Sequence, residues 1–222
     1  MNRPVYITSD LHFGHDDCDR HGVKSMISRA EKEDAWIIVA GDWFELIESD
    51  EISVMLKYKG LIDRISARLL MYTPGNHDSL IFQTKGRFPR AYYPAYVGSF
   101  DRKRFMVTHG HLCGPYSPVW ALADKLYKHR GLVAIARWIA NRKLFNFAQK
   151  AVSSRNYAEN YRDEIIHRAW LNHCDIVICG HSHVQEVHYD DDHGVLYLNP
   201  GSAIGRMRYI RFDGREFEPM SI

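Results

Sequence analysis

Short apolar runs recur along the chain, and each of them ends at a polar or glycine-rich segment. In the first half of the sequence they cover residues 5–8, 36–40, 69–72 and 105–108. Runs of this length and composition are typical of strands that are buried on both faces. Segments with helical spacing lie between them, near residues 23–34 and 52–67. This alternation of strands and helices predicts a layered α/β fold.

In the second half of the chain, the expected strands follow one another with fewer helices between them. Strands are expected at residues 175–179, 184–189, 194–198 and 207–212, and a helix is expected over residues 156–173. Because fewer helices separate these strands, a mixed sheet or two facing sheets is favoured over one parallel sheet. The 222 residues fit a single domain over 1–222. From about residue 115 to 155, apolar and basic residues alternate without a strand signal, which predicts an inserted helical cap.

Charge and cysteine content narrow the class of protein. The net charge is +2, but residues 115–170 carry ten Lys or Arg against four Asp or Glu. The small net charge and the lack of a recognisable nucleic-acid module argue against a nucleic-acid partner. Four cysteines without a C-x-x-C pair favour a reducing compartment. Neither a signal region nor an apolar run of about 18 residues is found, so a cytoplasmic protein that does not span a membrane is expected.

Polar motifs follow the predicted strands. They are Asp10-Leu11-His12, Gly41-Asp42, Gly75-Asn76-His77-Asp78, His109-Gly110-His111 and Gly180-His181-Ser182-His183. Any one of them could be ordinary turn or cap chemistry. The ends of strands in α/β sheets, however, converge on one crevice. Carboxylate, amide and imidazole groups together suit a first-row transition metal better than Ca²⁺ or Mg²⁺, so the series predicts a metal centre.

In this order the motifs resemble the signature of the calcineurin-like metallophosphoesterases. The resemblance implies a two-sheet α/β sandwich flanked by helices, with two divalent cations, Mn²⁺ being expected, that activate a water molecule for attack on phosphorus. It implies that Asp10, His12 and His183 bind the first cation, that Asn76, His109 and His181 bind the second, and that Asp42 bridges the two. A bridging carboxylate makes physical sense because it offers a separate oxygen to each of two cations about 4 Å apart.

Other residues of these motifs take roles around the cations. His77 follows the expected ligand Asn76, and we assign it as a catalytic group that protonates the leaving oxygen. Glu45 stands where related phosphatases keep an acidic residue that orients this histidine, although an exposed carboxylate at a helix start is the alternative. Asp78 and His111 are assigned to the surroundings of the ligands. The sequence contains no Walker A motif, no Gly-x-Ser-x-Gly elbow and no catalytic-cysteine signature, so no protein nucleophile is expected.

A narrower resemblance concerns the substrate. The segments Ser9-Asp10-Leu11-His12, Gly41-Asp42-Trp43-Phe44-Glu45 and His109-Gly110-His111-Leu112-Cys113 resemble the UDP-2,3-diacylglucosamine pyrophosphatase branch. That branch has Gly-Asn-Arg-Asp and His-Gly-Asp where this chain has Gly75-Asn76-His77-Asp78 and His109-Gly110-His111. The resemblance implies a nucleotide-linked lipid substrate and peripheral contact with the inner membrane.

The expected substrate-binding residues follow from that branch. They are Trp138 in the cap and Ser154, Arg155 and Asn156 near the head group, with Arg155 as a clamp for the diphosphate. The alternative function is a general phosphodiesterase or phosphoprotein phosphatase with an open polar cleft. A third class, a metal-stabilised scaffold without activity, would be expected to lack some of the ligand residues, all of which are present here.

Overall fold

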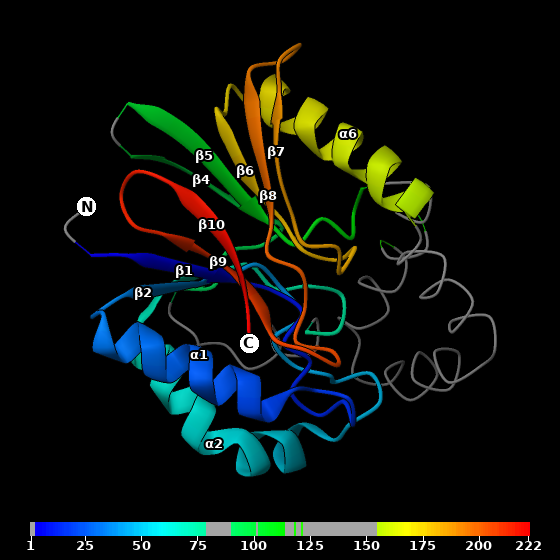
Figure 1. The fold of residues 1–222 in the computed structure, drawn as a ribbon. Coiled ribbons are helices and arrows are strands. Elements are labelled where there is room, and N and C mark those ends of the chain that lie inside the picture. Colours follow the sequence, from blue (N-terminus) through cyan, green and yellow to red (C-terminus); the bar gives the residue numbers. More distant parts are fainter. Residues whose placement is uncertain (1–2, 79–89, 101, 114–117, 119–120, 122–154) are drawn as a thin grey trace.

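The computed structural model describes residues 3–78, 90–100, 102–113, 118, 121 and 155–222. Two five-stranded sheets face each other (Figure 1). The first sheet has the order β10-β9-β1-β2-β3 and consists of β1 (Val5–Thr8), β2 (Trp36–Val39), β3 (Leu69–Tyr72), β9 (Arg208–Phe212) and β10 (Phe217–Ser221). The second has the order β4-β5-β6-β8-β7 and consists of β4 (Ala95–Phe100), β5 (Lys103–Thr108), β6 (Ile176–Ile178), β7 (Glu186–Asp190) and β8 (Val195–Asn199).

Both sheets are mixed, as the sequence predicted. The strands β1, β2 and β3 run parallel, whereas β9 and β10 are antiparallel to their neighbours. In the second sheet β5, β6 and β8 run parallel, and β4 and β7 are antiparallel at the edges. Within each parallel set the carboxyl ends lie at the same edge, and the loops that leave this edge carry the polar motifs.

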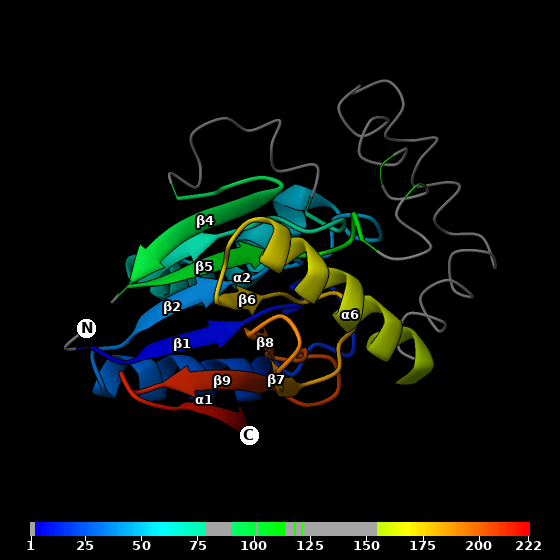
Figure 2. The ribbon, with the colours of Figure 1, turned by 90° about the horizontal axis from the view of Figure 1, so that it is seen from above.

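Helices cover the outer faces of the sandwich. The helices α1 (Arg20–Lys32) and α2 (Glu51–Ala67) lie side by side on the first sheet, and α6 (Arg155–Leu171) lies on the second (Figures 1 and 2). Asp19 and Asp50 cap α1 and α2 by accepting hydrogen bonds from backbone N–H groups of their first turns. Within the described residues, no helix is long and apolar enough to cross a membrane.

The core explains why the central strands were easy to predict. Side chains from both sheets, among them Ile7, Ile38, Ile178 and Leu198, meet in one buried cluster between the layers. A second cluster fills the space between the first sheet and its two helices. Each central strand is therefore buried on both faces and needs a continuous apolar run.

Two strands of the structure were missed by the sequence analysis. β4 alternates between partly buried and exposed residues and contains Gly98, and β10 contains Pro219 and is mostly exposed. Both are edge strands, where Pro and polar residues are tolerated because one side of the backbone has no partner strand. The predicted cap, residues 115–155, lies outside the described residues except for Pro118, Ala121 and Arg155, and the single domain likewise remains a prediction.

Candidate metal centre

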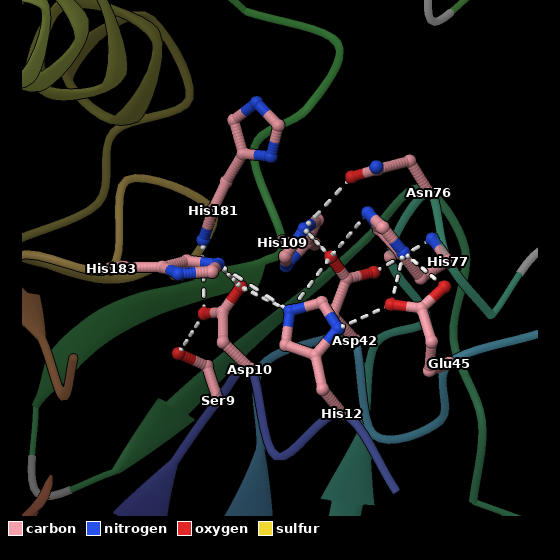
Figure 3. Close-up of polar contacts among 12 residues, drawn as sticks. Ser9, Asp10, His12, Asp42, Glu45, Asn76, His77, His109, His181 and His183 are labelled. Carbon is pink, nitrogen blue, oxygen red and sulfur yellow. Dashed lines mark hydrogen bonds and ion pairs between the residues drawn. The ribbon is translucent and has the colours of Figure 1, made fainter. Parts of the chain in front are cut away.

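The polar motifs converge at one edge of the sandwich (Figure 3). Of the seven expected ligands, all are buried except His183, which is partly exposed. Two sets have donor atoms that all lie within 4.8 Å of one another, namely Asp10, His12 and His183, and Asp42, His109 and His181. The first set contains the three residues assigned to the first cation, and the second contains His109 and His181 of the second assignment together with Asp42; their roles as ligands remain predictions. A third set, His12, Asp42 and His77, lies between them and has the same spacing.

The backbone at the centre is strained. Asp10, His12, Asp42, His181 and His183 all have positive φ angles, between 46° and 69°. Residues other than glycine adopt this region at a cost and keep it only where the surrounding structure fixes them, most often at functional sites. Hydrogen bonds between loops provide the fixation, because the N–H groups of Asp10 and His12 donate to the carbonyls of Gly41 and Asp42.

The first set is arranged around His12. Its Nδ1 lies 3.0 Å from Glu45 Oε2, and because a carboxylate only accepts, Nδ1 carries the proton. The Nε2 atom therefore carries a lone pair, and it lies 3.4 Å from His183 Nε2 and 3.9 Å from Asp10 Oδ1. His183 Nε2 lies 3.1 Å from the same Asp10 oxygen. The other Asp10 oxygen accepts from the Ser9 hydroxyl and the His181 N–H, which fixes the carboxylate.

The second set is arranged around His109. Its Nδ1 donates to the Ala40 carbonyl at 3.0 Å, which directs Nε2 toward Asn76 Oδ1 and Asp42 Oδ2, each 3.1 Å away. Asp42 Oδ2 is also 3.9 Å from His12 Nε2, and Oδ1 accepts from the His77 N–H at 2.8 Å. Asp42 thus lies between the two histidine sets, at the place where a bridging ligand is needed.

Charges at the centre favour cation binding. Burial alone would raise the pKa of Asp10, but His183 nearby holds it at about 2. Burial opposes ionisation of Asp42 as well, yet His109 and His77 keep its pKa well below the usual value. Burial would lower the pKa of His109, but the Asp42 carboxylate outweighs it and raises the pKa to about 9. A proton therefore occupies the His109 position in the metal-free protein, and a cation would replace it.

The donor set fits a pair of transition-metal ions. His12 and His109 each use one ring nitrogen to hold their orientation and present the other to the carboxylates, as metal-binding histidines do. Nitrogen and oxygen donors in this mixture suit the first-row divalent metals. The residues present therefore fit the cofactor that the sequence predicted, and their individual roles as ligands are proposals.

His77 and Glu45 form a buried pair beside the bridging carboxylate. His77 Nδ1 lies 2.8 Å from Glu45 Oε1 and 2.7 Å from Oε2, which leaves Nε2 directed toward Asp42 Oδ2 at 4.0 Å. Burial disfavours the imidazolium, but Glu45 and Asp42 outweigh this and raise the pKa of His77 to about 10. Glu45 is fully buried and α2 begins only at Glu51, so the exposed helix-start alternative for Glu45 is wrong.

Asp78 and His111 lie close to the expected ligands. The Asp78 carboxylate accepts from the N–H groups of Trp43, Phe44 and Gly75, and so joins the loop after β2 to the loop after β3. His111 is buried, with its ring centroid 5.5 Å from that of His109 and 6.4 Å from that of His181.

The sequence did not predict a buried contact of Tyr161. The Tyr161 hydroxyl of α6 lies 3.0 Å from the His109 carbonyl and 3.3 Å from the Gly180 carbonyl, so it holds two ligand loops together. A side chain at Gly110 would overlap this hydroxyl. In the sequence, Tyr161 lies four residues from both Tyr157 and Ile165, which is the spacing of an ordinary apolar helix face.

The expected substrate-binding residues remain predictions. Arg155 and Asn156 belong to the first turn of α6, which is as much as the structure describes of them. Ser154 and Trp138 lie outside the described residues.

Two facing mixed sheets that bring buried carboxylates and imidazoles to one edge define an α/β sandwich with a candidate metal site. The sequence model of the Calcineurin-like phosphoesterase superfamily domain matches residues 4–213, and the chain therefore belongs to this superfamily. Its activity is accordingly that of a metal-dependent hydrolase of phosphoric esters. No curated protein matches the sequence.

Solved structures share the fold at low sequence identity. Vps29 from Chaetomium thermophilum is 14% identical, with 96% of this chain and 82% of that chain covered and a TM-score of 0.52. A predicted phosphoesterase from Streptococcus pneumoniae is 18% identical, with 99% and 88% covered and a TM-score of 0.47. Vps29 from Entamoeba histolytica, in complex with zinc, is 15% identical, with 98% of each chain covered and a TM-score of 0.46. At 14% identity, the likeness to the Chaetomium thermophilum protein shows the fold alone.

Proposed function

We propose that this protein hydrolyses phosphate esters at a binuclear centre in which Asp42 bridges two divalent cations. The observation that carries the proposal is the position of Asp42 Oδ2, 3.1 Å from His109 Nε2 and 3.9 Å from His12 Nε2. Because Oδ1 is engaged by the His77 N–H, Oδ2 is the oxygen placed between the two imidazole sets, where one carboxylate atom would bridge both cations. We further propose Mn²⁺ as the cation, since the donors are nitrogen and oxygen atoms without a thiolate.

The proposed hydrolysis assigns different roles to the ligand residues and to His77. When bound, two cations lower the pKa of a water molecule between them and neutralise the phosphate oxygens as displacement proceeds. Asp10, Asn76 and the four histidines His12, His109, His181 and His183 would hold the cations. His77 stands beside the bridging carboxylate with Nε2 4.0 Å from Asp42 Oδ2, and its role is to donate a proton from this nitrogen to the leaving oxygen.

The His77–Glu45 pair bears on the substrate. An alkoxide leaves poorly and gains from a proton donor, whereas a nucleotide phosphate is already a good leaving group. The presence of a positioned donor favours a phosphomonoester or phosphodiester with an alcohol leaving group.

A nucleotide-linked lipid diphosphate such as UDP-2,3-diacylglucosamine is the second candidate. The segment Gly41-Asp42-Trp43-Phe44-Glu45 and the basic region before α6 favour it. This candidate includes a cap over residues 115–155 that binds acyl chains and rests on the inner membrane, with Arg155 on the diphosphate. Replacing Trp138 and Ile139 together by Ser tests it, because turnover of a diacylated substrate should fall while turnover of a short soluble diester is kept. Equal losses on both substrates would count against the lipid candidate.

A hydrolysis screen tests the main proposal. The Mn²⁺-loaded protein would be given a phosphomonoester, a nucleotide diester, a phosphopeptide and UDP-2,3-diacylglucosamine, with Asp42→Asn as the comparison. Turnover of an ester that requires the metal and is lost in Asp42→Asn is expected, because the amide is uncharged and bridges poorly. Full activity in metal-free protein or in Asp42→Asn would refute the binuclear mechanism.

A further inference from the structure

A basic groove is lined by residues of α1 and α2. These two helices lie side by side on the outer face of the first sheet (Figure 1). The volume of the groove is about 510 Å³, and its walls include Arg20, His21 and Lys24 of α1 and Lys57, Tyr58 and Arg64 of α2. None of the described residues that line it is an Asp or a Glu. None of the expected metal ligands lines it either, so the groove is separate from the centre described above.

Only one of the basic side chains named above is paired with a carboxylate of the described residues. Arg64 is paired with Glu31 through contacts of 2.8 Å and 2.6 Å. Within the part of the chain that the structure describes, no carboxylate lies at ion-pair distance from Arg20, Lys24 or Lys57. A solvated protein surface normally carries interspersed charges of both signs, whereas the described charged residues that line this groove are all basic and come from two helices.

Two of these cations converge on one aromatic ring. The Arg20 guanidinium carbon lies 5.0 Å from the centroid of Tyr58, and the Lys57 ammonium lies 5.5 Å from the same centroid. Each contact is favourable by itself. Both positive charges therefore lie around one ring, and an anion bound at this place would be attracted by both of them.

The floor of the groove packs against a residue that neighbours the metal centre in the sequence. Tyr58 is buried, and its ring stacks on Phe13 with centroids 4.6 Å apart and an interplanar angle of 11°. Phe13 directly follows the ligand His12, and its N–H donates to the Trp43 carbonyl. The cations around Tyr58 are therefore presented by a fixed platform, which reduces the ordering cost of binding.

We propose that this groove binds a small phosphate compound that carries several negative charges, such as the phosphate chain of a nucleoside polyphosphate. A guanidinium and ammonium groups that converge in a compact hollow match closely spaced phosphates, and the guanidinium can bind phosphate oxygens in a bidentate manner. An acidic peptide would need its carboxylates spread along an extended backbone, and the groove offers a cluster instead. The site goes beyond the proposed hydrolysis, because it lies on another face and takes its ligand without metal.

Calorimetric titration of the metal-free full-length protein with inorganic tripolyphosphate tests the proposal. The variant is Arg20→Ala combined with Lys57→Ala, and Lys24→Glu is a second, independent variant. All three side chains are exposed, so folding should be kept, as circular dichroism can verify. The matched control is Lys59→Ala, which removes an exposed lysine of the same helix that is paired with Asp63 and does not line the groove.

Tripolyphosphate should bind the unaltered protein and the Lys59→Ala protein with affinities within about twofold of each other. The double variant and Lys24→Glu should each bind roughly tenfold more weakly or worse, the scale of one lost charge-assisted hydrogen bond. No binding to the unaltered protein, equal affinity in the variants, or equally tight binding of a hexaglutamate peptide would each overturn the proposal. Because no metal is present, the outcome does not depend on whether the protein hydrolyses esters.

Discussion

Replacing Glu45 by Gln tests how the metal centre and its proton donor are held. The Glu45 carboxylate is fully buried and accepts from Nδ1 of both His12 and His77, at 3.0 Å and 2.7–2.8 Å. Gln keeps the shape but removes the charge, and it places an amide N–H₂ where Oε1 now lies 2.8 Å from His77 Nδ1. The two ring N–H groups must then share one uncharged carbonyl oxygen, and this weaker buried contact should lower the free energy of unfolding by about 1–3 kcal/mol.

The functional loss in Glu45→Gln should appear in two separate measurements. Affinity for the first cation should fall about 10- to 100-fold, the usual effect of removing a partner that orients a metal-binding histidine. Turnover of esters with poor leaving groups should fall by about 10²-fold, because His77 loses the carboxylate that holds it. Metal titration and a series of aryl phosphates of rising leaving-group pKa measure the two effects. Glu48→Gln, the same change at an exposed position three residues away, is the control.

The stability change in Glu45→Gln should also depend on pH. Glu45 and Asp42 raise the pKa of His77 to about 10 in the metal-free protein, so the protonated imidazole stabilises the fold fully below its unfolded pKa of about 6.5. This contribution is lost as the pH rises through about 10. The difference in unfolding free energy between the two proteins should therefore shrink from pH 6 toward pH 10. Unchanged metal affinity together with equal loss across the leaving-group series would refute the dual role of Glu45.

Three further predictions concern neighbouring residues. His77→Ala should lower kcat by about 10²-fold for poor leaving groups and by less for activated ones, and equal losses across the series would assign His77 to metal positioning instead. Metal affinity should rise about tenfold per pH unit below pH 9, because the cation must displace the proton of His109. Burial opposes this proton, but Asp42 outweighs burial and raises the pKa of His109 to about 9. A calorimetric affinity that stays constant from pH 6.5 to 9 would contradict this prediction. Tyr161→Phe should lower the free energy of unfolding by about 1 kcal/mol, because two buried carbonyls lose their shared donor, and a melting temperature equal to that of the unaltered protein would show that the contact contributes nothing.

The parts of the fold that could be predicted are those that a continuous apolar run encodes. β1, β2 and β6 are packed between another sheet and a helix layer, so both of their faces select apolar residues. The three described helices begin and end within three residues of the expected positions. The expected ligands could be placed at one edge because each follows such a strand, and parallel strands end together.

Other features depend on contacts that are distant in the sequence. Tyr161 has the local pattern of a core residue, and only the packing of α6 brings its hydroxyl to the loops of His109 and Gly180. The edge strand β10 is recognisable only through its antiparallel pairing with β9, since Pro219 and its exposed neighbours give no periodic signal. In such cases tertiary pairing overrides the local pattern.

The sequence predicts the motifs of the metal centre but not the backbone conformation that they adopt. Glycine adopts positive φ angles readily, and Gly41 and Gly110 have them. Asp10, His12 and Asp42 adopt the same region although each pays a steric cost there. Asp10 and His12 are two residues apart and would lie on the same side of an extended backbone as well, so their proximity alone does not require positive φ. The hydrogen bonds between loops, such as those accepted by the carbonyls of Gly41 and Asp42, fix this backbone. These bonds join segments that are distant in the sequence, which is why the motif could be predicted and its backbone geometry could not.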